Sequence, residues 1–156
     1  TEEQKTLLKS LEGRSEPTAV AKDPYRGAPG LRFISGAFTL LVGRNAKENE
    51  ELLRRWARGN DWWMHTRDTP GGYVFIKSIA GKSIPLETLL DAANLALLYS
   101  KAKDAGKADL YYTQVKYLKR PKGGKTGLVI PTQEKNIPVQ LDETRIKRLF
   151  SAKVEP

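Results

Sequence analysis

The sequence predicts an α+β fold. In it, a mixed or antiparallel sheet built from hairpins packs on one long core helix, beside a shorter basic amphipathic helix. Segments rich in β-branched and aromatic residues occur in pairs around glycine-containing turns, which is typical of hairpins. Residues 83–103 carry leucine and alanine on nearly every side, as expected for a helix inside a core. Strands precede and follow this helix, and that order favours a sheet packed against it. At 156 residues, the chain is long enough for one domain with a substantial core.

The first 30 residues differ in composition from the rest of the chain. Residues 12–30 contain three glycines and three prolines but few large apolar residues, so we expect residues 1–30 to form a flexible arm or linker. The folded domain is expected over residues 31–150. It begins with a predicted hairpin that pairs residues 31–34 with residues 38–42.

A basic helix is expected after Gly43 ends that hairpin. Asn45 suits the N-cap, because Glu48 follows three residues later in a capping-box arrangement. The helix is predicted over residues 46–58, where a glycine follows it. Its apolar side carries two leucines and a tryptophan, and the opposite side carries cations. These cations are Lys47, Arg54 and Arg58.

Residues 61–77 predict two strands around a turn at residues 69–72. Alternation along a strand places Trp62 and Met64 on one face and Trp63 and His65 on the other. We expect one of these pairs in the core and the other nearer the surface. The long core helix should follow, with Pro85 in its first turn.

The second half of the chain predicts three further strands and a closing helix. Residues 109–119 alternate clearly, and a turn leads to a second strand at residues 127–130. A third strand is expected at residues 136–141 and a short helix at residues 144–150. The predicted hairpin concentrates basic side chains, namely Lys116, Lys119, Arg120, Lys122 and Lys125.

The charge balance favours a polyanionic partner. The chain holds 27 Lys and Arg against 18 Asp and Glu, a formal net charge of +9. Cations of this kind bind phosphates and release condensed counterions. Cysteine is absent, which excludes disulfides and thiolate chemistry. No apolar run approaches the length of a membrane span, and we see no signal-peptide segment, so we expect a cytoplasmic protein without a membrane partner.

Catalytic interpretations find little support. Residues 123–126 resemble the end of a P-loop, but the first glycine of that motif and the following helix are missing. His65 is the only histidine, so histidine-based zinc sites lack ligands. An RNA-processing enzyme that uses His65 with Asp61 or Asp68 remains an alternative. We expect no enzyme activity, and neither a metal nor a cofactor.

Several motifs in order carry a resemblance. They are Gly43-Arg44-Asn45-Ala46-x-x-Asn49, Asp61-x-Trp63-x-His65, Asp68-x-Pro70-Gly71 and Lys119-x-Pro121-x-Gly123-x-Lys125-x-Gly127. This pattern resembles the NFACT-R domain of the bacterial fibronectin-binding protein A family, also called the ribosome quality-control factor, and of its archaeal and eukaryotic relatives. The chain departs from the family at Gly72-Tyr73, where Ser-His is frequent, and at Thr126, where proline is frequent.

The resemblance implies an RNA-binding module in translation or ribosome quality control, with tRNA, rRNA or the large ribosomal subunit as partner. The alternative to RNA is a protein-interaction module that docks on ribosomal proteins. The residues expected to contact RNA are Arg44, Lys47, Arg54, Arg58, Trp63, His65, Tyr73, Lys116, Lys119, Arg120, Lys122 and Lys125, with the aromatic residues and His65 in base-stacking or positioning roles. The residues expected to shape the backbone or the motif are Gly43, Asn45, Asn49, Asp61, Pro70 and Gly71.

Overall fold

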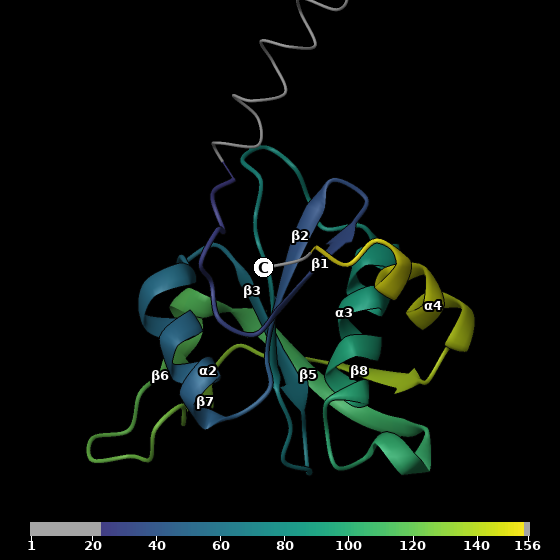
Figure 1. Cartoon of the computed structure of the whole chain (residues 1–156). Helices are drawn as coiled ribbons and strands as arrows, with labels where there is room; N and C mark the ends of the chain where they lie inside the picture. Colours follow the sequence, from purple (N-terminus) through teal and green to yellow (C-terminus); the bar gives the residue numbers. More distant parts are fainter. Residues whose placement is uncertain (1–22, 155–156) are drawn as a thin grey trace, which may run out of the picture.

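A six-stranded antiparallel sheet forms the centre of the computed structural model, which describes residues 23–154 (Figure 1). The strand order is β1-β2-β4-β3-β5-β8. The strands are β1 (Leu31–Ser35), β2 (Phe38–Gly43), β3 (Trp62–Thr66), β4 (Tyr73–Ile76), β5 (Lys107–Gln114) and β8 (Lys135–Gln140). The predicted α+β class is confirmed, and every pairing in this sheet is antiparallel. Most of the arm expected at residues 1–30 lies outside the described residues.

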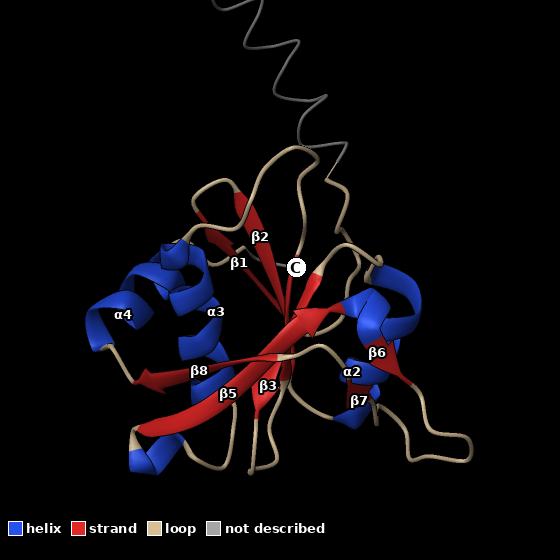
Figure 2. Ribbon diagram, turned by 180° about the vertical axis from the view of Figure 1, so that it is seen from behind, coloured by secondary structure: helices blue, strands red, loops and turns tan. Residues whose placement is uncertain are grey.

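Helices and a small second sheet cover the two faces of the large sheet (Figure 2). On one face lie α3 (Leu86–Leu98) and α4 (Glu143–Ser151). On the other lie α2 (Ala46–Glu51), the π-helical turn η1 (Leu52–Trp56), and the two-stranded sheet of β6 (Leu118–Lys119) and β7 (Ile130–Pro131). Two short 3₁₀ turns, η2 (Lys103–Ala105) and η3 (Val115–Tyr117), flank β5.

Each face of the sheet therefore buries its own core. Met64 and the apolar side chains of α3 belong to the first core, with Trp62 at its edge. Trp63 belongs to the second core, together with Leu52 of η1. The expectation that one pair of β3 side chains lies in the core and the other nearer the surface is wrong, because each pair contains one buried and one half-buried residue and α2, η1 and β6–β7 cover the face that holds Trp63.

A buried carboxylate attaches α4 to the rest of the first core. Asp91 of α3 accepts hydrogen bonds from Ser35 (2.5 Å), Arg145 (2.7 Å) and Arg148 (2.5 Å). Burial acts to raise the pKa of Asp91, but the hydrogen bonds from Arg148, Ser35 and Arg145 hold it below its usual value. The closing helix is thus held to α3 and β1 through a charged network.

The basic helix is shorter than expected. Asn45 caps α2 as predicted, because its side chain accepts a hydrogen bond from Glu48 N. From Leu52 the chain changes to π geometry, in which Ala57 N donates to Leu52 O over 2.8 Å, and it then becomes extended. Arg58 consequently lies beyond the helix. A wheel drawn at 100° per residue does not hold across a π turn, because such a turn places more residues in each revolution.

The later elements also depart from their predicted bounds. The long helix begins only at Leu86, because Pro85 has an extended backbone and serves as the N-cap. The predicted strand at residues 109–119 ends at Gln114, where η3 redirects the chain. The basic hairpin is therefore a separate sheet, in which Lys119 pairs with Ile130.

Contacts with the domain reach N-terminal to the expected boundary at residue 31. The carboxylate of Asp23 lies 2.7 Å from the guanidinium of Arg32 in β1. Tyr25 packs against the second core, and its ring centroid lies 5.6 Å from Lys77 Nζ. Residues 23–30 therefore pack on the sheet.

Candidate nucleic-acid interface

Two basic segments lie side by side on one face of the large sheet (Figure 1). Exposed cations on α2 and η1 are Lys47, Arg54 and Arg55, and those on β6 and the loop after it are Lys119, Arg120, Lys122 and Lys125. We call these seven residues the basic surface. A shallow cavity of about 180 Å³ between the two segments is lined by α2 and η1 residues and by Thr126 of the loop.

Glu50 joins the two segments. Its carboxylate pairs with Arg120 of the hairpin and accepts a hydrogen bond from Gly127 N over 2.7 Å. Arg54, four residues further along, lies 4.0 Å from the same carboxylate. The Arg120 guanidinium holds the pKa of Glu50 below its usual value, with the Gly127 backbone acting in the same direction. One acid therefore fixes the spacing of cations that come from distant parts of the sequence.

The glycine and asparagine of the first motif attach α2 to the sheet. Asn49 is buried, and its Oδ1 accepts a hydrogen bond from Tyr73 N over 3.2 Å. A Cβ on Gly43 would lie 2.2 Å from that same Oδ1, so only glycine leaves room for the asparagine. These two residues place the helix against β2 and β4.

Asp61 holds the chain that follows η1. Its carboxylate pairs with the Lys77 ammonium, and it accepts hydrogen bonds from Arg58 N over 2.7 Å and Ser78 N over 2.8 Å. Lys77 Nζ also donates to Trp56 O over 2.6 Å. Asp61 is 1% exposed and Lys77 is 6% exposed. The acid of the second motif is therefore part of a buried ion pair that ends the basic helix.

The aromatic residues of the second motif form a packed cluster. The His65 ring stacks on Trp63 at 5.9 Å and meets the edge of Tyr73 at 5.1 Å. Trp63 is only 1% exposed and Tyr73 only 7% exposed. Neither ring has a free face for a base, so the direct stacking expected of these two residues is corrected to an internal role. His65 is half-buried.

Burial also sets the charge state of this cluster. It lowers the pKa of His65, and a backbone hydrogen bond at Gly71 acts in the opposite direction. It raises the pKa of Tyr73 to about 12. Both groups are accordingly neutral near pH 7, and the cations of this face come from lysine and arginine.

The remaining predicted site residues occupy the margins of this face. Arg44 is exposed, and its guanidinium binds both carboxylate oxygens of Glu48. The exposed Lys116 donates to Asn60 Oδ1 over 3.2 Å. Pro70 accepts a backbone hydrogen bond from Lys101 over 3.0 Å, and a Cβ on Gly71 would lie 2.8 Å from the Cβ of Ser100, so this turn is docked against the end of α3. The structure does not place Arg44 or Arg58 in the cavity between α2 and the hairpin.

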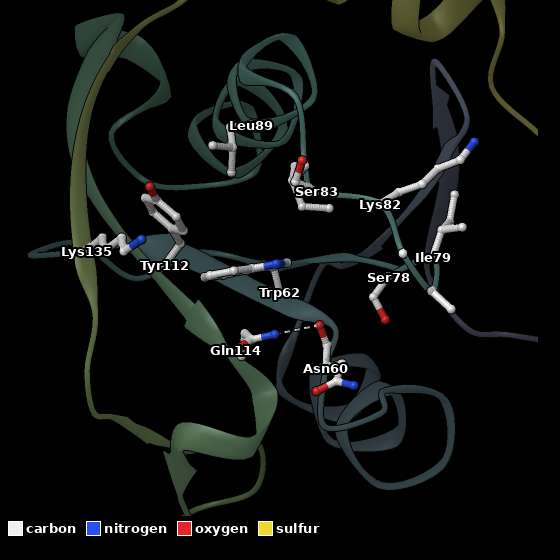
Figure 3. A pocket seen from close by; sticks show the side chains of 13 residues that line it. Asn60, Trp62, Ser78, Ile79, Lys82, Ser83, Leu89, Tyr112, Gln114 and Lys135 are labelled. Atoms are coloured by element: carbon white, nitrogen blue, oxygen red, sulfur yellow. Dashed lines mark hydrogen bonds between the residues drawn. The ribbon is translucent and has the colours of Figure 1, made fainter.

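Sequence reasoning missed a second feature, a pocket of about 480 Å³ at the edge of the first core (Figure 3). Trp62, Tyr112 and Lys135 lie around it, from β3, β5 and β8. The alternation of β3 did separate Trp62 from Trp63. Lys135 could not be assigned, because only the pairing of Tyr112 with Lys135 between β5 and β8 brings it there.

Within residues 23–154, no cluster of three or more His, Cys, Asp or Glu side chains is arranged to hold a metal ion. The helices of this same range are all too short or too polar to cross a bilayer.

The fold and this face define a class: a small α+β module that presents cations from two segments over a fully packed aromatic core. Comparison with known proteins gives the family. The family described as "NFACT protein RNA binding domain" matches residues 32–132 of this chain. The chain belongs to this family of RNA-binding domains, as its motifs predicted.

The relatives agree with this membership. The Rqc2 homolog RqcH of Bacillus subtilis is 34% identical over 137 residues, which cover 87% of this chain and 22% of that protein. The NEMF homolog of Drosophila melanogaster, named as a subunit of the ribosome quality control complex, is 38% identical over 74 residues, or 47% of this chain and 8% of that protein. The chain thus spans about a fifth of the RqcH relative.

A solved structure supports the same fold. The C-terminal part of the fibronectin/fibrinogen-binding protein from Streptococcus suis superimposes with a TM-score of 0.69 at 33% identity. The match covers 77% of this chain and 49% of that chain.

Proposed function

We propose that this chain binds structured RNA, tRNA or rRNA, through the basic surface, and that it does so in ribosome-associated quality control in the cytoplasm. The observation that carries the proposal is the joining of two cationic segments by Glu50. Cations held at fixed spacing match a phosphate backbone better than mobile ones, since less conformational entropy is lost on binding. The ribosomal setting rests on the names of the RqcH and NEMF relatives.

The proposal is for binding rather than catalysis. His65 is packed among aromatic rings, and Asp61 is engaged with Lys77 and two backbone N–H groups. His65 and Asp61, one of the two acids named for an RNA-processing enzyme, are thus engaged in structural contacts, whereas the other, Asp68, is exposed. The basic surface, in contrast, has its side chains exposed to solvent.

The direct test is charge reversal on the hairpin loop. Lys119, Lys122 and Lys125 are exposed, and none makes an ion pair with another described residue. The test variant is Lys119→Glu, Lys122→Glu, Lys125→Glu. A matched control, Lys101→Glu, Lys103→Glu, Lys107→Glu, makes the same charge change on exposed residues around η2.

Binding should be measured by fluorescence anisotropy with tRNA and with an rRNA fragment over a series of salt concentrations. Each phosphate contact contributes about 0.7 to 0.9 to the slope of log K against log salt. The slope for the loop variant should therefore be smaller in magnitude than that for wild type by about 2 to 3. The control variant should change the affinity far less than the loop variant does. Equal affinity and equal slopes for the loop variant and wild type, on both RNAs, would show that the hairpin does not contact RNA. Co-sedimentation with large ribosomal subunits would then test the ribosomal setting separately.

A further inference from the structure

The pocket at the edge of the first core has walls from both the sheet and a loop (Figure 3). Trp62 and Tyr112 form its aromatic floor, with ring centroids 5.6 Å apart and planes inclined by 53°. Residues 78–84, which lead into α3, form the opposite wall. Lys135 Nζ lies 5.9 Å from the centroid of the Trp62 ring. Its volume of about 480 Å³ falls within the roughly 300–1,000 Å³ of small-molecule sites.

The chemistry of the lining suits a flat ring that carries a phosphate. Trp62 and Tyr112 are both partly exposed, unlike the enclosed Trp63. The amide of Gln114 lies at the rim, where its Nε2 donates to the Asn60 carbonyl over 3.1 Å. The lining contains two lysines, Lys82 and Lys135, and neither aspartate nor glutamate. Aromatic faces bind every base, amides read base edges, and a lysine holds phosphate.

A hydrogen bond links one residue of the pocket to the chain that enters the basic hairpin. Asn60 lines the pocket, and its Oδ1 accepts a hydrogen bond from Lys116 Nζ over 3.2 Å. Lys116 lies in η3, which leads directly into β6 and the loop of the basic surface. Lys116 therefore lies between the hairpin and the pocket, at a position where it can contact a strand that runs from one to the other.

We propose that this pocket takes one unpaired base of the bound RNA, stacked on Trp62, with the phosphate of that nucleotide beside Lys135. The choice of RNA as the source of the base rests on the proposed function. The pocket adds what the basic surface lacks. Phosphate contacts are independent of sequence, whereas a base in a pocket selects loops, bulges or ends over uninterrupted duplex.

The first experiment uses the whole chain and simple probes. AMP, GMP, CMP and UMP are each titrated into ¹⁵N-labelled protein, and the indole N–H signal of Trp62 and the side-chain amides of Asn60 and Gln114 are followed by NMR. Ribose 5-phosphate serves as the control, because it carries the phosphate without the base. We expect saturable shifts of these signals with the nucleotides and much smaller ones with ribose 5-phosphate. Equal shifts with both would reduce the pocket to an anion site and overturn the proposal. Absent shifts at Trp62 would also overturn it.

The second experiment places the pocket in RNA binding. Trp62→Leu should weaken binding to an RNA hairpin with an unpaired loop by about 5- to 150-fold, the usual value of one base–aromatic stack. Binding to a blunt RNA duplex should change little. Lys135→Gln, with the exposed Lys147→Gln of α4 as its matched control, tests the site without altering the aromatic floor. Equal loss on loop and duplex, or no loss in either pocket variant, would contradict base capture.

The two proposals fail in different ways. The loop variant with three reversed charges should lose affinity for RNA yet keep the nucleotide-dependent shifts at Trp62. If that variant binds RNA as wild type does, the basic surface is wrongly assigned. If nucleotides leave Trp62 unchanged while the loop variant still loses RNA, only the pocket is wrongly assigned.

Discussion

Breaking the buried pair of Asp61 and Lys77 should destabilise the domain strongly. Asp61→Asn keeps the size of the side chain and leaves Oδ1 able to accept from Ser78 N, at 2.8 Å in the native protein. The amide that replaces Oδ2 cannot accept from Arg58 N, at 2.7 Å, and it places a donor against the Lys77 ammonium. The lysine side chain is 7% exposed, so its charge remains buried without a negative counter-charge.

The size of the effect follows from that burial. Removing one partner of a buried ion pair costs about 3–5 kcal/mol, since the remaining charge is left without compensation. For a folded unit of about 130 residues, this corresponds to a fall in Tm of about 11–18 °C. Asp68→Asn makes the same chemical change on an exposed side chain and should stay within about 0.5 kcal/mol of wild type.

Equilibrium urea unfolding of four proteins tests the reasoning: wild type, Asp61→Asn, Lys77→Met and the double variant. The two single variants should each be destabilised. The double variant should cost less than their sum, by a coupling energy of up to about 3 kcal/mol, because no charge is then left alone. Additive losses, or an Asp61→Asn loss no larger than that of Asp68→Asn, would refute the argument that this buried ion pair stabilises the domain.

Three further variants test other parts of the fold. Gly43→Ala brings a Cβ to 2.2 Å from Asn49 Oδ1, so its free energy of unfolding in urea should fall by about 1–3 kcal/mol, whereas Gly59→Ala should be nearly neutral. Burial lowers the pKa of His65, so the imidazole binds a proton more readily in the unfolded state than in the folded one. Stability should therefore fall as the pH drops below about 6.5. His65→Phe should remove this pH dependence in urea melts between pH 5 and 8. Burial acts to raise the pKa of Asp91, but hydrogen bonds hold it below its usual 3.8. The contribution of Asp91 to stability is therefore lost as the pH falls through the folded pKa. Asp91→Asn should flatten the acid-unfolding curve and cost about 3–5 kcal/mol of stability at pH 7.

Local features of the fold could be predicted from the sequence where one interaction dominates. The hairpin of β1 and β2, with Leu31 opposite Val42, follows from alternation and a glycine turn. The N-cap at Asn45 follows from side-chain chemistry alone. Alternation also separated Trp62 from Trp63 correctly. It could not say which of them would be enclosed, because that depends on what covers each face of the sheet.

The features that could not be predicted depend on contacts between distant segments. The π turn after Glu51 ends at Trp56, whose carbonyl accepts a hydrogen bond from Lys77, and Arg58 N then donates to Asp61. Neither Lys77 nor Asp61 lies in the helix. The hairpin forms a sheet of its own because η3 turns the chain away from β5. Lys135 reaches the pocket only through its pairing with Tyr112.

Several residues that carry the family resemblance are buried, whereas the residues of the basic surface are exposed. Asn49 and Asp61 are buried and hold α2 and the chain after η1, while the exposed lysines of the hairpin loop make no ion pair with another described residue. Changes at the buried residues should therefore lower stability and RNA affinity together, because the cations they position become misaligned. Changes at Lys119 or Lys122 should lower affinity alone. A variant of Asn49 that unfolded more easily yet bound RNA as tightly as wild type would show that the motif serves the core and not the basic surface.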